Sequence, residues 1–491
     1  MDLNYIGGDW VPSRSGRTLA SCNPTTGETL GIVPASDASD VDAACRAARA
    51  AFDRWRLTPA PRRAEILFRA AELLRERKEA LARLMSQEMG KVLEEARGDV
   101  QEAIDMTLFA AGEGRRLLGY TTPAEMPDKF AMAVREPVGV VAAITPWNFP
   151  LAIPSWKLMP ALVAGNTCVF KPAEDTPLCA CRLVELLEEA GLPPGVLNLV
   201  HGRGEEAGAA LVRHPEVDLV SFTGGTDTGR EVATAAAASL KRTVLEMGGK
   251  NAVIVLEDAD LDLAVDGITW SAFGTSGQRC TAASRVLIHT AVFAEVRDRL
   301  VARAEALRLG DPLDPAVQVG PLVNAAQLER VAGYVALARE EGARVLCGGE
   351  RATTAPLDRG YYFRPTYLDC VTPAMRVAQE EIFGPVTCLI PVRDLDEAIQ
   401  INNSVAYGLS SGIFTRDLMR AFRAMRELRT GIVYLNAGTI GAEVHLPFGG
   451  MRATGNGHRE AGQAMLDAVT EWKSVYVEYS GRLQRAQIDR D

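Results

Sequence analysis

The sequence has 491 residues, of which 47% are hydrophobic and 24% charged, and its formal net charge at pH 7 is −10. This composition is typical of a globular protein and excludes a disordered chain, and the length predicts roughly three domains. The acidic balance argues against a general nucleic-acid surface and against an anionic-membrane surface, so we expect no nucleic acid and no membrane as partners.

Helices dominate the first third of the predicted structure. A short hairpin-like start lies at residues 6–10, and apolar residues then recur at helical spacing over residues 59–84. Asp37 or Ser39 is placed to cap an earlier helix that runs to Trp55. The pattern therefore predicts a helical segment that precedes the main sheet.

From Val138 onward, short apolar runs alternate with helical segments. The runs span residues 140–144, 167–170, 196–200, 217–222 and 252–256, and helical segments such as 177–190 and 226–238 follow them. Continuous apolar strands between helices predict a parallel sheet that is covered on both faces. This is a doubly wound α/β domain, which binds ligands at the carboxyl ends of its strands.

A second α/β series follows Cys280. Its candidate strands are residues 285–289, 345–346, 388–392, 412–415 and 432–435. The fold class is therefore α/β with two doubly wound domains, and Cys280 falls at the junction between them. Clefts between domains are frequent sites for small molecules.

Cys280 is the strongest candidate for chemistry. It lies in the run Phe-Gly-Thr-Ser-Gly-Gln-Arg-Cys-Thr-Ala, residues 273–282, whereas Cys168 lies in the apolar run Thr-Cys-Val-Phe that is typical of a structural cysteine. The neighbouring cation of Arg279 would favour the thiolate, which is the reactive form. We therefore predict that Cys280 is a nucleophile rather than a structural cysteine.

Two further residues have the chemistry that a thiol nucleophile needs. Glu246 ends an apolar strand and precedes Met-Gly-Gly-Lys, so it is placed to be a general base, although a buried structural carboxylate fits equally. Asn148 lies in Pro-Trp-Asn-Phe-Pro after the first strand, where its amide could stabilise an oxyanion. A turn role for this asparagine is the alternative.

Several loops could hold a dinucleotide. Residues 224–229, Gly-Gly-Thr-Asp-Thr-Gly, follow a strand and open a helix, where N–H groups can hold phosphate; a tight turn fits as well. Gly202, Gly204 and Gly208 miss the G-x-G-x-x-G spacing by one residue and fit a glycine-rich turn. Lys171 and Glu174 could bind ribose hydroxyls or form a solvated surface pair.

The cysteines and the N-terminus indicate the compartment. Nine irregularly spaced cysteines predict free thiols in a reducing compartment, and with only five histidines a zinc site is not expected. The start Met-Asp-Leu-Asn-Tyr lacks the basic region and apolar core of a signal peptide. We expect a cytoplasmic protein without a metal.

Taken together, these motifs resemble those of the NAD(P)-dependent aldehyde dehydrogenase superfamily, from Tyr5 to Tyr479. The matching runs are Thr-Pro-Trp-Asn-Phe-Pro at 145, Lys-Pro-Ala-Glu at 171, Phe-Thr-Gly-Gly-Thr at 222, Leu-Glu-Met-Gly-Gly-Lys at 245, Gly-Gln-Arg-Cys at 277, Glu-Ile-Phe-Gly-Pro at 381 and Pro-Phe-Gly-Gly at 447. Their order and approximate separations fit as well.

The resemblance implies a role for each matching residue. Cys280 would add to an aldehyde, Asn148 would stabilise the oxyanion, and Glu246 would activate the water that hydrolyses the thioester. NAD is the expected cofactor, with NADP disfavoured by Glu174. The implied cofactor contacts are Ile144, Thr145, Pro146, Trp147, Lys171, Glu174, Gly204, Gly224, Gly225, Thr226, Gly229, Gly248, Glu381 and Phe383. Many relatives carry serine where Gly225 stands.

The resemblance also implies a division into domains. A dinucleotide-binding domain would comprise residues 1–118 and 137–248, and a catalytic domain residues 249–473. Residues 119–136 and 474–491 would form a small β oligomerisation element and a C-terminal arm, which pair protomers into a homodimer or homotetramer.

The substrate follows less directly from the sequence. Gly441 and Ala442 in the loop before Pro-Phe-Gly-Gly resemble a loop that anchors the carboxylate of semialdehydes, and Arg279 could favour an acidic substrate. Flexibility and thiolate tuning are the alternative roles. Glu246 favours release of a free acid over transfer to coenzyme A. A coenzyme A-acylating enzyme and a catalytically silent structural relative remain the alternatives.

Overall fold

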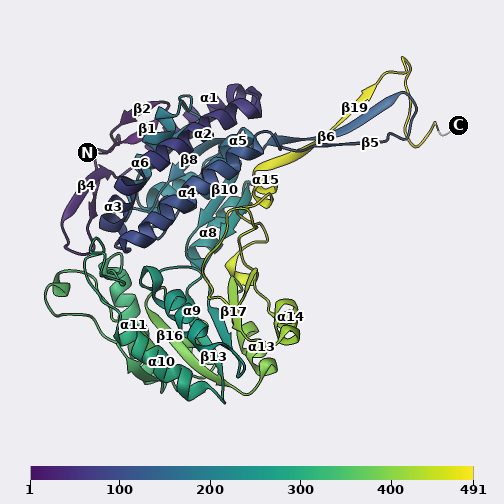
Figure 1. Cartoon of the computed structure of the whole chain (residues 1–491). Coiled ribbons are helices and arrows are strands. Elements are labelled where there is room, and N and C mark those ends of the chain that lie inside the picture. Colours follow the sequence, from purple (N-terminus) through teal and green to yellow (C-terminus); the bar gives the residue numbers. More distant parts are fainter. Residues whose placement is uncertain (1, 490–491) are drawn as a thin grey trace.

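The structure is a computed structural model that describes residues 2–489. Residue 1 and residues 490–491, the ends of the predicted first domain and of the predicted arm, lie outside the described residues. Figure 1 shows two lobes, each built around a sheet, and a long arm that projects from the upper lobe and carries the C-terminal end. The fold class expected from the sequence, α/β with two doubly wound parts and a β element, is confirmed.

The upper lobe contains a seven-stranded sheet in the order β11-β10-β7-β8-β9-β1-β2. Its strands are β7 (Val140–Ile144), β8 (Thr167–Lys171), β9 (Leu197–Leu199), β10 (Leu219–Thr223), β11 (Arg242–Glu246), β1 (Asn4–Ile6) and β2 (Asp9–Val11). The first five pair in parallel, and β1 adds an antiparallel hairpin at the edge. The residues of β7, β8 and β9 are all buried, which explains why these strands read as continuous apolar runs.

Helices cover both faces of this sheet. They are α1 (Ala38–Leu57), α2 (Ala60–Glu76), α3 (Lys78–Met89), α4 (Leu93–Glu113), α5 (Ala152–Ala164), α6 (Pro177–Glu189), η1 (Gly204–Gly208), α7 (Ala209–Arg213) and α8 (Thr226–Ala237). Asp37 caps α1 through a capping box with Asp40, as one of the two predicted caps. The predicted helix over residues 59–84 is instead α2 and α3, because the chain leaves helical geometry at Arg77.

The lower lobe contains a second seven-stranded sheet, in the order β14-β15-β16-β13-β12-β17-β18. Its strands are β12 (Asn251–Val255), β13 (Ala283–His289), β14 (Arg344–Cys347), β15 (Thr366–Asp369), β16 (Val386–Val392), β17 (Ser410–Phe414) and β18 (Ile432–Leu435). Its helices are α9 (Leu261–Phe273), η2 (Gly274–Gly277), α10 (Phe293–Glu305), α11 (Ala325–Glu340), η3 (Leu357–Arg359), α12 (Arg376–Gln379), α13 (Leu395–Asn403), α14 (Leu418–Glu427) and η4 (Arg452–Thr454). The last helix, α15 (Ala464–Val469), packs against α5 in the upper lobe. Only β15 has no counterpart among the predicted strands.

The arm is a three-stranded antiparallel sheet in the order β19-β6-β5 (Figure 1). Its strands are β5 (Tyr120–Thr122), β6 (Lys129–Pro137) and β19 (Thr470–Glu478). A separate hairpin, β3 (Thr18–Cys22) with β4 (Thr29–Pro34), lies near the N-terminus and was not expected from the sequence. Within residues 2–489, no helix is both long enough and apolar enough to cross a membrane.

Candidate active site

The carboxyl ends of the five parallel strands carry most of the predicted site residues. Ile144 ends β7, and Thr145, Pro146 and Trp147 follow it; Lys171 ends β8, Gly204 lies after β9, Gly224 follows β10 and Glu246 ends β11. Since these strands are adjacent in the sheet, the loops lie along one edge. This edge and the loop that contains Cys280 meet at the seam between the two lobes.

Cys280 follows a left-handed turn. Thr275, Ser276 and Gly277 have φ values of 53°, 55° and 70°, so three successive residues adopt a conformation that only glycine adopts readily. The carbonyl of Cys280 accepts a hydrogen bond of 2.7 Å from the Asn251 side chain. The thiol is half-buried, at the position where the turn leads into β13.

The electrostatic environment of Cys280 differs from the prediction. Burial, together with the charges of Glu381 and Glu246, raises the pKa of the Cys280 thiol to about 12. The guanidinium of Arg279 is engaged elsewhere: its Nε donates to the Thr275 hydroxyl and its Nη2 lies 3.8 Å from Glu95. The expectation that Arg279 favours the thiolate is therefore wrong for this state of the protein.

Asn148 is buried beside the nucleophile loop. Its Nδ2 donates to the carbonyl of Gln278 at 3.0 Å, across 130 residues of sequence, which places the amide two residues before Cys280. An amide NH₂ has two hydrogens, so this bond leaves one for an oxygen atom bound at the cysteine. The backbone N–H of Cys280 is the natural second donor of such an oxyanion hole.

Glu246 is buried at the end of β11, against the turn that contains Gly449. A Cβ atom on Gly449 would lie 2.4 Å from Oε1 of Glu246, so the carboxyl group occupies the space that a side chain would need. Burial and the neighbouring charge of Glu460 raise the pKa of Glu246 well above its usual value, whereas Lys157 opposes the shift. The protonated form of the carboxyl group is therefore favoured more strongly here than in water.

Lys157 and Glu460 were not predicted from the sequence. They form a buried ion pair, and Lys157 also donates to the Ser221 hydroxyl at 3.1 Å. The charges of these two side chains act on Glu246 in opposite directions, since Glu460 raises its pKa and Lys157 lowers it. No local pattern reveals the pair, because the two residues are 303 positions apart in the sequence.

A second cluster forms around Glu381. Its Oε1 accepts a hydrogen bond of 2.9 Å from the Gly249 N–H, and a Cβ atom on Gly248 would lie 2.3 Å from Oε2. Burial raises the pKa of Glu381 to about 7. Phe383 packs edge-on against Trp147, with ring centroids 5.4 Å apart. Four predicted cofactor residues from three segments are thus brought together.

A third cluster lies at the other end of the edge. Lys171 donates to the Pro172 carbonyl at 2.7 Å and pairs with Glu174 at 3.4 Å. Beside it is a cavity of about 300 Å³, whose lining includes Ile144, Gly204, Phe222, Thr228 and Val232. Its size and largely apolar walls suit a flat aromatic base.

The start of α8 lies between these clusters. Gly225 caps the helix without a side-chain hydrogen bond, and Thr226 is its first residue. A Cβ atom on Gly229 would lie 2.2 Å from the sulfur of Met247, so this helix packs too closely for a side chain there. The N–H groups of its first turn are available to an anion.

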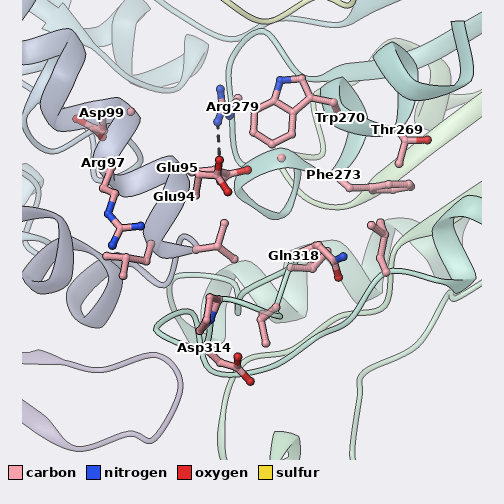
Figure 2. A pocket seen from close by; sticks show the side chains of 18 of the residues that line it. Glu94, Glu95, Arg97, Asp99, Thr269, Trp270, Phe273, Arg279, Asp314 and Gln318 are labelled. Carbon is pink, nitrogen blue, oxygen red and sulfur yellow. Dashed lines mark ion pairs between the residues drawn. The ribbon is translucent and has the colours of Figure 1, made fainter. Parts of the chain in front are cut away.

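A larger cavity of about 990 Å³ lies beside Arg279 (Figure 2). Arg279, Phe149, Trp270, Glu95 and Glu102 contribute to its wall, with α4 on one side and α9 on the other. The guanidinium of Arg279 lies 5.2 Å from the ring centroid of Phe149 and 5.3 Å from that of Trp270. Gly441 and Ala442, predicted to contact the substrate, do not line this cavity.

The arrangement can support covalent chemistry on a carbonyl group. The thiol of Cys280, the amide of Asn148 and the carboxyl group of Glu246 lie at the seam between the lobes. Sites that suit an aromatic ring, an anion and a ribose extend along the same edge of the sheet. A thiolate addition needs an oxyanion donor, and hydrolysis of the resulting acyl group needs a base; both are within this set.

Comparison with known proteins agrees with this chemistry. A family model described as "Aldehyde dehydrogenase family" matches residues 10–475. The chain is 41% identical over 476 residues to an alpha-ketoglutaric semialdehyde dehydrogenase of Bacillus subtilis (strain 168), covering 97% of this chain and 98% of the relative. It is 42% identical to an alpha-ketoglutarate semialdehyde dehydrogenase of Haloferax volcanii, covering 97% and 99%.

Solved structures are equally similar. A crystal structure of betaine aldehyde dehydrogenase from Staphylococcus aureus in complex with NAD⁺ has a TM-score of 0.96 and 36% identity, covering 98% of this chain and 96% of that one. The crystal structure of HpcC from Thermus thermophilus has a TM-score of 0.95 and 43% identity, covering 99% and 94%. The similarity extends over both lobes and the arm.

Proposed function

The chain belongs to the aldehyde dehydrogenase family, and we propose that it oxidises a semialdehyde that carries a carboxylate to the corresponding diacid, with NAD⁺ as cofactor. The observation that carries the substrate class is the similarity of nearly the whole chain to named relatives. Two relatives with 41% and 42% identity are named as alpha-ketoglutaric or alpha-ketoglutarate semialdehyde dehydrogenases.

The first chemical step belongs to Cys280. The thiol releases its proton to solvent, its sulfur adds to the aldehyde carbon, and the carbonyl oxygen becomes an oxyanion that Asn148 and the Cys280 N–H stabilise. The resulting carbon bears sulfur, an oxyanion and hydrogen, so collapse of the oxyanion expels hydride and leaves a thioester on Cys280. When bound, NAD⁺ supplies the hydride acceptor.

The second step belongs to Glu246. A water molecule attacks the thioester while the carboxylate of Glu246 takes its proton, and the acid leaves as the Cys280 thiol is restored. Burial and the charge of Glu460 raise the pKa of Glu246, so a rise in pH increases the fraction of the carboxylate that can act as the base. The presence of Glu246 favours hydrolysis over transfer to coenzyme A.

The residues along the sheet edge fit NAD. The first turn of α8 would hold the pyrophosphate, the 300 Å³ cavity the adenine, Lys171 and Glu174 the adenosine ribose, and Glu381 the nicotinamide ribose. The Cβ positions of Gly229 and Gly248 are already filled by Met247 and Glu381, so the cradle excludes side chains at both places. The carboxylate of Glu174 favours NAD over NADP by repelling a 2′-phosphate.

We also propose that the protein is a cytoplasmic homodimer or homotetramer with the domain division expected above. Support for the compartment comes from the cysteines, all nine of which are free. Support for assembly comes from the arm, whose strand β19 exposes Trp472, Tyr476 and Val477. Exposed aromatic and branched residues along a protruding sheet are typical of an interface between subunits.

One experiment tests the proposed function. The purified protein is mixed with NAD⁺ and a panel of aldehydes of equal length that end in a carboxylate, a methyl group or a quaternary ammonium, with and without coenzyme A, and NADH is followed by its absorbance. We expect the carboxylate series to have the highest kcat/KM, without a requirement for coenzyme A. No NADH from any aldehyde would show a catalytically silent protein, and strict dependence on coenzyme A would show an acylating enzyme. Preference for the methyl or ammonium series would refute the substrate class.

A further inference from the structure

The turn that leads to Cys280 is held from outside its own lobe. Three successive left-handed residues, Thr275, Ser276 and Gly277, are an unfavourable conformation that persists only when the surroundings fix it. The Ser276 hydroxyl donates to the Gly320 carbonyl at 2.7 Å, which is a contact within the lower lobe. Thr275, in contrast, donates two hydrogen bonds to the upper lobe.

Glu95, on the first turn of α4, is the partner of Thr275. Its Oε2 accepts two hydrogen bonds of 2.8 Å, one from the Thr275 N–H and one from the Thr275 hydroxyl. The side chain of Glu95 is only 3% exposed. The same hydroxyl of Thr275 accepts a bond of 2.9 Å from Nε of Arg279, so a chain of hydrogen bonds runs from Arg279 through Thr275 to Glu95.

The same face of α4 also holds the loop that contains Asn148. Asp99, one helical turn after Glu95, accepts a bond of 2.8 Å from the Ala152 N–H at the start of α5. It pairs with Lys91 at 2.8 Å, both side chains being fully buried. The Lys91 ammonium lies 3.8 Å from the ring centroid of Phe149, the residue after Asn148. Phe149 therefore contacts two cations, each beside a carboxylate of α4.

These contacts converge on one geometric quantity, the placement of Asn148 relative to the backbone of Cys280. The two oxyanion donors come from different lobes, and α4 is bonded to the loops of both. Figure 2 shows Glu95 and Arg279 facing each other between α4 and the turn. A shift of about 1 Å in a donor is enough to reduce a rate about 100-fold.

We propose that Glu95 is a positioning residue of the active site: its carboxylate holds the left-handed turn so that the Cys280 N–H and the Asn148 amide reach the same oxyanion. The proposal rests on the nucleophile assignment of Cys280 made above. Glu95 acts as a hydrogen-bond acceptor here, and its negative charge beside Arg279 is not what positions the turn.

The variants that separate these two features are Glu95→Ala and Glu95→Gln. Glutamine keeps an oxygen that can accept both bonds from Thr275 but lacks the charge, whereas alanine lacks both. Asp105→Ala is the matched control, because Asp105 is exposed on the same helix and does not line the cavity beside Arg279. The readouts are the rate of the NADH burst with a saturating aldehyde, the KM for NAD⁺, and hydrogen exchange of the peptide that contains Thr275.

We expect Glu95→Ala to slow the burst by about 10- to 100-fold, with KM for NAD⁺ within twofold of wild type, and to speed exchange at Thr275. Glu95→Gln should stay within about threefold of wild type in the burst, and Asp105→Ala should match wild type. A burst unaffected in Glu95→Ala would overturn the proposal. Equal losses in Glu95→Ala and Glu95→Gln would also overturn it, because charge rather than the acceptor oxygen would then be responsible.

Hydrogen exchange separates this proposal from the proposed function. If the wild-type protein forms no NADH, the function fails, while exchange still decides whether Glu95 holds the turn. Unchanged exchange in both variants would refute the positioning role whatever the activity. If Glu95→Ala does not fold, the same comparison is made with Glu95→Gln and with Thr275→Val, which removes only the hydroxyl group. Hydrogen exchange as slow as in wild type, together with a full NADH burst, in Thr275→Val would refute the hydrogen-bond chain.

Discussion

At the scale of single residues, the protonation of the Cys280 thiol differs most from what the sequence predicted. A cation next in sequence predicted a thiolate, yet Arg279 points its donors at Thr275 and Glu95. Burial then dominates, and it favours the neutral thiol. Adjacency in sequence therefore gave the wrong sign for the pKa shift, because the direction of the side chain decides which group feels the charge.

This state predicts the pH dependence of alkylation in the protein without ligands. Because the pKa of Cys280 is raised to about 12, the thiolate fraction rises about tenfold for each pH unit below that value. We expect the iodoacetamide rate at Cys280 to climb between pH 7 and pH 10 without a plateau. Peptide mass spectrometry distinguishes Cys280 from the exposed Cys22 and Cys370. A plateau near pH 7 would show that the thiolate is already formed.

Glu246 gives a second prediction at this scale. Glu246→Gln removes the base for hydrolysis but not the thiol, so we expect a burst of about one NADH per subunit followed by a steady rate reduced about 100-fold or more. Rapid mixing with an aldehyde and NAD⁺ measures both phases. Glu443→Gln serves as the control, because the Glu443 carboxylate is exposed in the loop that precedes Phe448. This variant should leave both phases unchanged. A wild-type steady rate in Glu246→Gln would refute the base assignment.

At the scale of elements, the turn η2 is the most constrained piece of backbone near the site. Gly277 has φ of 70°, and a Cβ atom there would lie 2.3 Å from the carbonyl oxygen of Gly384. A backbone carbonyl cannot move aside as a flexible side chain can. The two segments that meet at Gly277 therefore leave no space for a side chain there.

Gly277→Ala should therefore destabilise the protein, by about 1–2 kcal/mol from the left-handed backbone and by more from the collision. The measurement is the denaturation midpoint in urea, together with the burst rate. Gly333→Ala is the matched control: Gly333 lies in α11 with no atom within 4 Å of its Cβ position. There alanine should stabilise the helix by about 0.4–1 kcal/mol. Equal midpoints for the two variants would contradict the packing described for η2.

The elements that the sequence predicted share a physical property. Strands such as β7 and β8 are buried on both faces and are therefore apolar at nearly every position, a signal visible in the chain alone. Strand β15 was not predicted because Thr366–Asp369 is short and mixes polar with apolar residues, although all four residues are buried. The break between α2 and α3 at Arg77 was not predicted because neither proline nor glycine lies there.

The same distinction applies to the site. Cys280, Glu246 and Asn148 were proposed from the sequence because each stands out from its own neighbours, and their roles stay predictions. Glu95 and Lys157 could not, because what defines them is a partner 180 or 303 residues away. Helical periodicity places Glu95 on α4 but contains no information about the turn that it contacts.

At the scale of the whole molecule, the arm is the part that packs least against the rest. Nine residue pairs join β19 to β6, and the outer positions Tyr476 and Tyr479 are 67% and 64% exposed. A strand with such an exposed surface needs a partner in solution, or it becomes a site of aggregation.

Replacement of both Tyr476 and Tyr479 by glutamate should therefore reduce the assembly to a smaller species. The mass from light scattering is the measurement, and circular dichroism should show the secondary structure unchanged. Leu240→Glu is the control, since Leu240 is 95% exposed but lies outside the arm. A wild-type monomer, or a double variant with unaltered mass, would contradict the role of the arm in assembly.

The return of the chain's last segment to the first lobe has a consequence for biosynthesis. The Val469 carbonyl accepts a hydrogen bond from Asn166, and Glu460 forms an ion pair with Lys157, so each pair joins residues 303 positions apart in the sequence. In the same way, β19 adds to the sheet of β6. On the ribosome, the edge of β6 that faces β19 and the surroundings of Lys157 emerge early and lack these partners until synthesis is almost finished. Strands left open in this way are exposed to misassembly, and chaperones protect such intermediates. A message truncated before codon 460 would thus yield a chain that has its nucleophile and its base but not the buried partner that completes the pocket of the base.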